Sequence, residues 1–157
     1  MAKVRAVPEG YATVTPALIL RDATKAIEFY KKAFGAKERE LILGPDNKVM
    51  HAEIEIGNSI VMLGDEMMGY RSAETIGGSP VAFYIYVEDV DTAFQNALDA
   101  GAKQTMKVSD MFWGDRIGQL EDPFGYKWSI ATHITDLTME QIQKGQEEWM
   151  RQMAAAK

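Results

Sequence analysis

The stretch ALILRDATKAIEFYKKAFGAK, residues 17–37, decides the fold, because the stretch YIYVEDVDTAFQNALDAGAK, residues 84–103, repeats its pattern. The two copies align at Asp22 and Asp89, which are 67 positions apart. In each copy an apolar strand leads to an aspartate that can cap a helix, about three turns of apolar residues at helical spacing follow, and a glycine ends the helix. We therefore predict an internal duplication.

Each copy continues into a β-hairpin. In the first copy, residues 49–56 and 59–63 flank the turn Gly57-Asn58, which places Glu53 opposite Met62. In the second copy, the sequence DPFG at residues 122–125 is typical of a type I turn followed by a glycine bulge. That turn places Glu121 opposite Lys127, and this pair of opposite charges supports the register.

Alternation along the strands gives each predicted sheet an apolar face and a mixed face. We assign the apolar faces to a core beneath the helices; they carry Leu18, Leu20, Ala52, Ile54, Val61 and Leu63 in copy one and Phe83, Ile85, Val87, Leu120, Trp128 and Ile130 in copy two. The mixed faces would line a pocket.

These patterns predict an α+β fold in which tandem βαβββ modules form a curved mixed sheet around a cleft, followed by a C-terminal helix. The expected divisions are an N-terminal extension at 1–12, the first module at 13–65, a linker loop at 66–79, the second module at 80–133 and the helix at 134–157.

Composition limits the classes of partner. The 157 residues carry 17 Lys and Arg against 23 Asp and Glu, a formal charge of −6, which disfavours binding to nucleic acid or to anionic membranes. The sequence has no cysteine, so it can form no disulfide, thiolate nucleophile or cysteine-type zinc site, and no apolar run reaches membrane-spanning length. We expect a cytoplasmic protein.

Three short motifs carry a family resemblance: MHAE at 50–53, FWGDR at 112–116 and DPFGYKW at 122–128. Together with the paired βαβββ pattern, over about residues 13–133, they resemble the PhnB-like subgroup of the vicinal oxygen chelate superfamily. Its members include glyoxalase I, extradiol dioxygenases, fosfomycin-modifying enzymes and bleomycin-binding resistance proteins. The resemblance implies a ligand cleft and a homodimer.

The resemblance also implies where a metal would bind. Carried over position by position, the ligands of the metal-dependent relatives fall on Thr15, Met62, Ala82 and Ser129. Two hydroxyls, a thioether and a methyl group are poor ligands for ions that prefer imidazole and carboxylate. We therefore predict that the ancestral metal site is absent and that no cofactor is needed.

His51 and Glu53 lie two residues apart on one strand, so both side chains point to the mixed face. Such a pair can chelate a metal or act as an acid–base couple, with Glu121 as the expected additional donor for a metal at a shifted site. Alternatively, Glu53 merely satisfies His51 in a polar wall. If the protein is an enzyme, these two residues are the predicted catalytic residues.

Aromatic and methionine side chains on the mixed faces would suit a small hydrophobic or aromatic ligand, although ordinary packing explains them equally well. The predicted ligand-binding residues are His51, Glu53, Met62, Tyr84, Tyr86, Trp113 and Glu121. Trp128 lies on the helix side and is expected to be structural, and His133 and Arg116 are expected at the surface.

Two functions from different classes remain open. The first is a small-molecule-binding protein without the superfamily metal; the second is a lyase, isomerase or dioxygenase that uses a shifted metal site or acid–base chemistry at His51 and Glu53. A third, partner-binding role concerns the tail, where Thr138 and Gln141 form a capping box. Trp149 in the helix that follows should dock on the body or on a second subunit.

Overall fold

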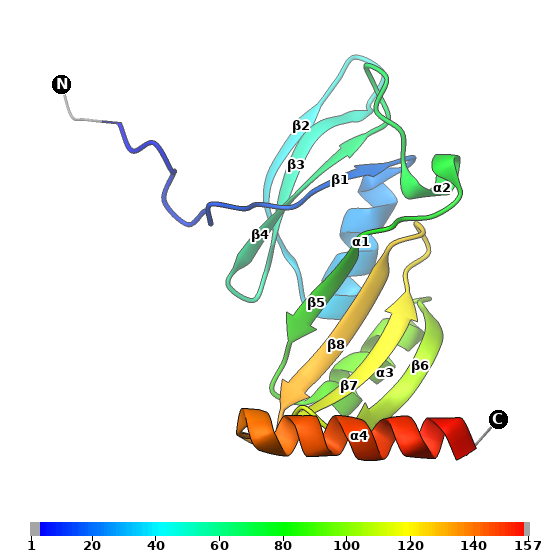
Figure 1. The fold of residues 1–157 in the computed structure, drawn as a ribbon. Coiled ribbons are helices and arrows are strands. Elements are labelled where there is room, and N and C mark those ends of the chain that lie inside the picture. The colour runs from blue at the N-terminus through cyan, green and yellow to red at the C-terminus, as the bar shows by residue number, and fades with distance from the viewer. Residues whose placement is uncertain (1–3, 156–157) are drawn as a thin grey trace.

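The computed structural model describes residues 4–155 and contains two βαβββ modules, a connecting segment and a final helix (Figure 1). The first module comprises β1 (Ala17–Leu20), α1 (Ala23–Phe34), β2 (Lys37–Leu43), β3 (Val49–Ile56) and β4 (Ser59–Asp65). The second comprises β5 (Ala82–Tyr86), α3 (Val90–Asp99), β6 (Lys103–Asp110), β7 (Asp115–Glu121) and β8 (Lys127–His133). Helix α2 (Ala73–Ile76) lies between them and α4 (Met139–Ala155) follows.

The two modules have the same topology, which confirms the predicted duplication. Their four-stranded sheets have the orders β1-β4-β3-β2 and β5-β8-β7-β6, with only the first and fourth strands of each module parallel. Ala17 pairs with Met62 in the first sheet, and Tyr84, at the equivalent position, pairs with Ser129 in the second. The mixed α+β fold predicted from the sequence is therefore correct.

Capping residues fix where α1 and α3 begin and where α1 ends. The Asp22 carboxylate accepts a hydrogen bond from the Lys25 amide at 3.0 Å, and Asp89 accepts one from the Thr92 amide at 3.1 Å. At the far end of α1, Gly35 adopts the left-handed conformation with φ of 65°.

Both hairpin registers are as predicted. Glu53 pairs with Met62 in the first hairpin and Glu121 with Lys127 in the second. Gly125 supplies the positive φ of 85° that the second turn requires.

The residues predicted for the helix-facing sides form or adjoin one core that runs through both modules. Helix α1 packs against α3, and aromatic rings from both modules meet at this junction. The buried carboxylate of Asp122 accepts hydrogen bonds from the Tyr30 hydroxyl at 2.7 Å and from the Trp128 indole at 2.9 Å. Because Tyr30 belongs to the first module, this hydrogen bond joins the two halves of the chain.

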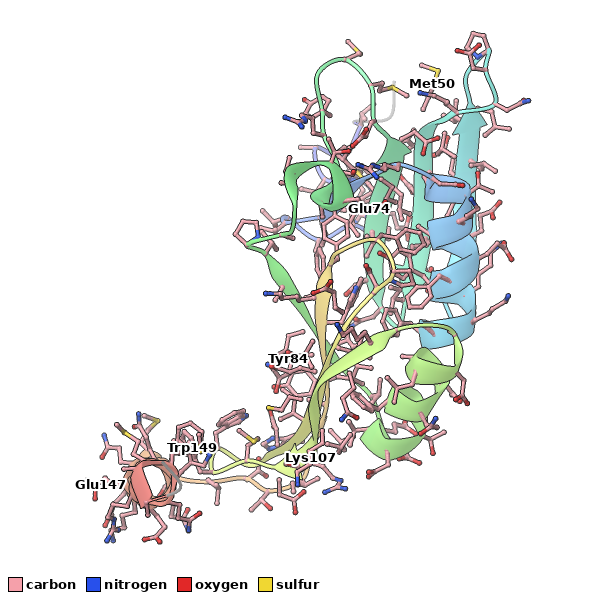
Figure 2. All side chains as sticks on the ribbon, turned by 90° about the vertical axis from the view of Figure 1, so that its right-hand side faces the viewer. Met50, Glu74, Tyr84, Lys107, Glu147 and Trp149 are labelled. Atoms are coloured by element: carbon pink, nitrogen blue, oxygen red, sulfur yellow. The ribbon has the colours of Figure 1, made fainter. Side chains whose placement is uncertain are left out.

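The last helix begins with the predicted capping box: the Thr138 amide donates to Gln141 Oε1 at 2.8 Å, and the Gln141 amide donates to Thr138 Oγ1 at 3.3 Å. No residue of α4 is buried. Trp149 points toward the second module, where its ring lies 5.9 Å from that of Phe112, whereas Glu147 points away (Figure 2). Within residues 4–155, no helix has the length and apolar character needed to cross a membrane.

The connecting segment, residues 66–81, is held in place by hydrogen bonds within it. Glu66 accepts from the Ser72 amide at 2.8 Å and from the Ser72 hydroxyl at 2.6 Å, and Ser72 caps α2. The Ser72 hydroxyl, the Thr75 hydroxyl and the Ser72 amide together lower the pKa of Glu66 to about 2.

Candidate functional site

Two clusters of polar side chains lie on the sheet faces opposite the helices. The first surrounds Glu53 on β3, which is 4% exposed. His51 Nε2 lies 3.2 Å from Glu53 Oε1, and the Tyr11 hydroxyl donates to the same oxygen. The hydrogen bond from Tyr11, together with His51, outweighs the effect of burial and lowers the pKa of Glu53. Met62 is the ladder partner of Glu53.

Tyr11 lies in the segment before β1, which crosses the first sheet (Figure 1). The Arg39 guanidinium lies 5.8 Å from the centre of the Tyr11 ring and 3.8 Å from Glu53 Oε2. The sequence predicted no part for this segment, because nothing in the local pattern shows that residue 11 returns to β3. The segment before β1 therefore contributes the Tyr11 phenol to the cluster, where it contacts both Glu53 and Arg39.

Glu40 completes the first cluster. It is the ladder partner of Glu53 across β2 and β3, and ligand atoms of Glu40, His51 and Glu53 all lie within 4.8 Å of one another. Glu121, the predicted additional donor, does not join this cluster within one chain. Glu121 lies on β7 of the other module, beside the connecting segment, where it lines a cavity of about 370 Å³ with Lys127.

The second cluster surrounds Asp115 at the start of β7, which is 3% exposed. Its Oδ2 atom accepts hydrogen bonds from the Tyr84 hydroxyl at 2.8 Å, the Tyr86 hydroxyl at 3.0 Å and the Trp113 indole at 3.1 Å. His133 Nδ1 lies 2.8 Å from Oδ1. The structure thus brings together the three aromatic residues predicted to bind a ligand.

Electrostatics favours an ionised Asp115. Burial alone would raise the pKa of Asp115, but the hydrogen bonds from His133, Tyr84, Tyr86 and Trp113 outweigh it and lower the pKa. The Asp115 carboxylate in turn raises the pKa of His133, and burial followed by the same carboxylate raises the pKa of Tyr84.

Sequence reasoning missed the contacts of Asp115 and His133. His133 is half exposed, as expected for a surface residue, yet it is bonded to a buried carboxylate. The FWGDR motif contains Asp115, but only the β7–β8 register, which pairs Asp115 with His133, shows what the carboxylate contacts. Arg116 is partly exposed and forms ion pairs with Asp91 and Asp110 at 2.7–2.9 Å.

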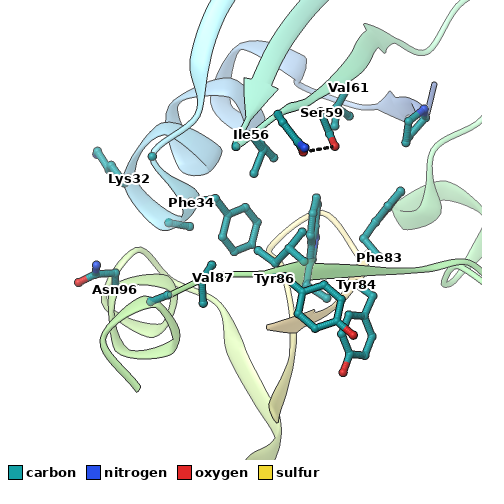
Figure 3. A pocket seen from close by; sticks show the side chains of 18 residues that line it. Lys32, Phe34, Ile56, Ser59, Val61, Phe83, Tyr84, Tyr86, Val87 and Asn96 are labelled. Carbon is teal, nitrogen blue, oxygen red and sulfur yellow. Dashed lines mark hydrogen bonds between the residues drawn. The ribbon is translucent and has the colours of Figure 1, made fainter. Parts of the chain in front are cut away.

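Within one chain the two clusters lie on different sheets. Between the modules, beside the free edge of β5, lies a cavity of about 790 Å³ (Figure 3). Phe34, Ile56 and Val61 border it from the first module, and Phe83, Tyr84, Tyr86 and Trp128 from the second. Tyr84 and Tyr86, whose hydroxyl groups donate to Asp115, also border this cavity, with their rings on the side of β5 away from Phe34 (Figure 3).

The four positions implied for the ancestral metal do not fit a divalent ion. The Thr15 hydroxyl donates to Ala12 O at 3.1 Å, and the Ser129 hydroxyl accepts from Gln119 at 3.3 Å. Met62 offers only a thioether and Ala82 no donor, so this set lacks the imidazole and carboxylate ligands that such ions prefer.

The fold and the paired modules define a class of protein, and comparison with known families gives the same class. Residues 12–130 match the glyoxalase/bleomycin resistance protein/dioxygenase superfamily, and the chain belongs to that superfamily.

Relatives occur in bacteria and plants. The chain is 42% identical to Mycobacterium tuberculosis protein Rv0887c over 135 residues, which cover 83% of this chain and 79% of that protein. It is similar to the crystal structure of the Arabidopsis thaliana At5g48480 product, with a TM-score of 0.64 and 29% identity over 77% of this chain and 98% of that one. A PhnB protein from Bacillus cereus has a TM-score of 0.61 at 19% identity, covering 77% of this chain and 99% of that one, which shows the shared fold.

Proposed function

We propose that this protein binds a small, planar, largely apolar molecule against β5, without the metal of its metal-dependent relatives. One observation carries the proposal: Tyr84 and Tyr86 both border the cavity and donate hydrogen bonds to the buried carboxylate of Asp115. The cavity volume of about 790 Å³ lies within the range of small-molecule sites, roughly 300–1,000 Å³.

The anchoring of these rings supports binding rather than ordinary packing. Tyr84 and Tyr86 remain 44% and 64% exposed although their hydroxyl groups are held. Tyr84 projects from the sheet face opposite α3 (Figure 2). An aromatic ring that is already ordered loses little conformational entropy when a ligand stacks on it, so more of the contact energy becomes affinity.

A homodimer is part of the proposal. His51, Glu53 and Met62 lie on the first sheet and Tyr84, Tyr86 and Trp113 on the second, so the predicted residues do not surround one ligand within a single chain. In a symmetric dimer, the first sheet of each copy would lie over the second sheet of the other copy. The dimer would then contain two equivalent pockets, each lined by residues of both copies. The cysteine-free composition supports a cytoplasmic location.

Calorimetric titration with 2-naphthol, a neutral planar probe, tests the ligand site. Loss of both Tyr84 and Trp113 removes two aromatic contacts of about 0.5–1.5 kcal/mol each, so the double alanine variant should bind about fivefold or more weakly. The matched control is Tyr70→Ala, which removes an exposed ring from the connecting segment. Equal affinity in the double variant and the control would refute the proposed site.

A second candidate function is a lyase, isomerase or dioxygenase reaction with His51 and Glu53 as an acid–base pair. The 3.2 Å separation of His51 Nε2 from Glu53 Oε1 and the partial exposure of His51 support it. A catechol and the glutathione adduct of an α-ketoaldehyde are suitable first substrates. Turnover that persists in His51→Gln would exclude this chemistry.

A further inference from the structure

We propose that Glu40, His51 and Glu53 form a binding site for a first-row divalent cation, such as Zn²⁺, on β2 and β3. This site differs from the positions implied for the ancestral metal, which lie on or next to β1, β4, β5 and β8. One imidazole and two carboxylates are a mixed nitrogen and oxygen ligand set that Zn²⁺ and its neighbours accept. The ligand pocket on β5 does not need this ion, so the inference goes beyond the proposed function.

The strands fix the geometry. His51 and Glu53 alternate onto the same face of β3, and Glu40 lies opposite Glu53 after an irregularity in β2 that follows Glu38. The candidate ligand atoms lie within 4.8 Å of one another. Metal bonds of about 2.0–2.2 Å bring tetrahedral ligands to roughly 3.5 Å apart, so the site must contract on binding.

Glu40 is the side chain that can make this movement. It is exposed and, among residues 4–155, it takes part in no hydrogen bond or ion pair. Glu53, by contrast, is buried and held by Tyr11. The site therefore combines a fixed ligand with an adjustable one, and three protein ligands leave a position open for water or substrate.

The local charge also favours a cation. The Arg39 guanidinium lies 3.6 Å from Glu55 and 3.8 Å from Glu53, and Glu40 adds a third carboxylate opposite Glu53 on β2. One guanidinium does not balance three carboxylates, and like charges at this spacing repel one another. A divalent ion at Glu40, His51 and Glu53 would offset the excess.

The test uses the full chain, depleted of metal and then titrated with Zn²⁺ by calorimetry and with Co²⁺ by visible absorbance. We expect one ion per chain and Co²⁺ bands that report nitrogen and oxygen ligation. Glu40→Gln should weaken Zn²⁺ binding at least tenfold without loss of fold, because the exposed side chain makes no contact that stabilises the protein.

Glu38→Gln is the matched control. It removes the same charge from the same strand, but Glu38 pairs with Lys31 of α1 on the other side of the sheet. We expect its Zn²⁺ affinity to equal that of the parent, and that of His51→Gln to fall with Glu40→Gln. Equal affinities in Glu40→Gln and Glu38→Gln, or no stoichiometric binding by the parent protein, would overturn the proposal.

Discussion

Replacing Tyr30 with phenylalanine should lower the free energy of unfolding by about 1.5–2 kcal/mol. Tyr30 is fully buried, and its hydroxyl donates to Asp122 Oδ2 at 2.7 Å across the junction of the modules. The substitution retains the ring, which packs 5.4 Å from Trp128, so only the hydrogen bond is lost. Asp122 keeps donors from Trp128 and from the Phe124 and Tyr126 amides, which places the loss at the low end of the range for charged acceptors.

Urea unfolding measures this loss as a lower midpoint at unchanged slope. Tyr126→Phe is the matched comparison, because the Tyr126 hydroxyl also crosses the junction but donates at 2.8 Å to a neutral acceptor, the backbone carbonyl of Ile19. That variant should lose only about 0.5–1.5 kcal/mol. The reasoning is refuted if Tyr30→Phe costs no more than Tyr126→Phe.

Three other features can be tested by substitution, pH and truncation. Gly118→Ala should destabilise the protein by about 1–3 kcal/mol in urea unfolding, because its Cβ would lie 2.6 Å from the Phe94 ring; an unchanged midpoint would show that the ring yields freely. Asp115 raises the pKa of His133, so the stabilisation from this pair is present below about pH 6.5 and is lost as the pH rises through the folded-state pKa. His133→Gln should remove that part of the pH dependence of unfolding, and an identical profile would contradict it. Truncation after Leu137 should give a monomer by light scattering and should weaken 2-naphthol binding, because the partner copy completes the pocket, whereas a truncated dimer would exclude a part for α4 in assembly.

The fold could be predicted because its signals are local. Asp22 and Asp89 cap the helices that follow them, and the two hairpin turns set registers that the structure confirms. Strand alternation then separated the core face from the mixed face, because side chains on a strand point to opposite sides in turn. No long-range information was needed for these steps.

The site could be predicted only in part, since its contacts join distant segments. The sequence predicts Tyr84, Tyr86 and Trp113 as ligand-binding residues, but it does not identify the carboxylate of Asp115 to which all three donate. The contact of Tyr11 with Glu53 spans 42 residues and depends on the path of the segment before β1. Two-residue alternation also could not place Glu40, because the strand is irregular just before it.

The central claim, that a planar ligand binds at the aromatic cluster held by Asp115, is tested most directly by nuclear magnetic resonance. The protein has three tryptophans, so the indole N–H signals of Trp113, Trp128 and Trp149 can be followed together during titration with 2-naphthol. Ligand binding at the cluster predicts the largest shift for Trp113. A Trp113 signal that stays in place through saturation with 2-naphthol would contradict it.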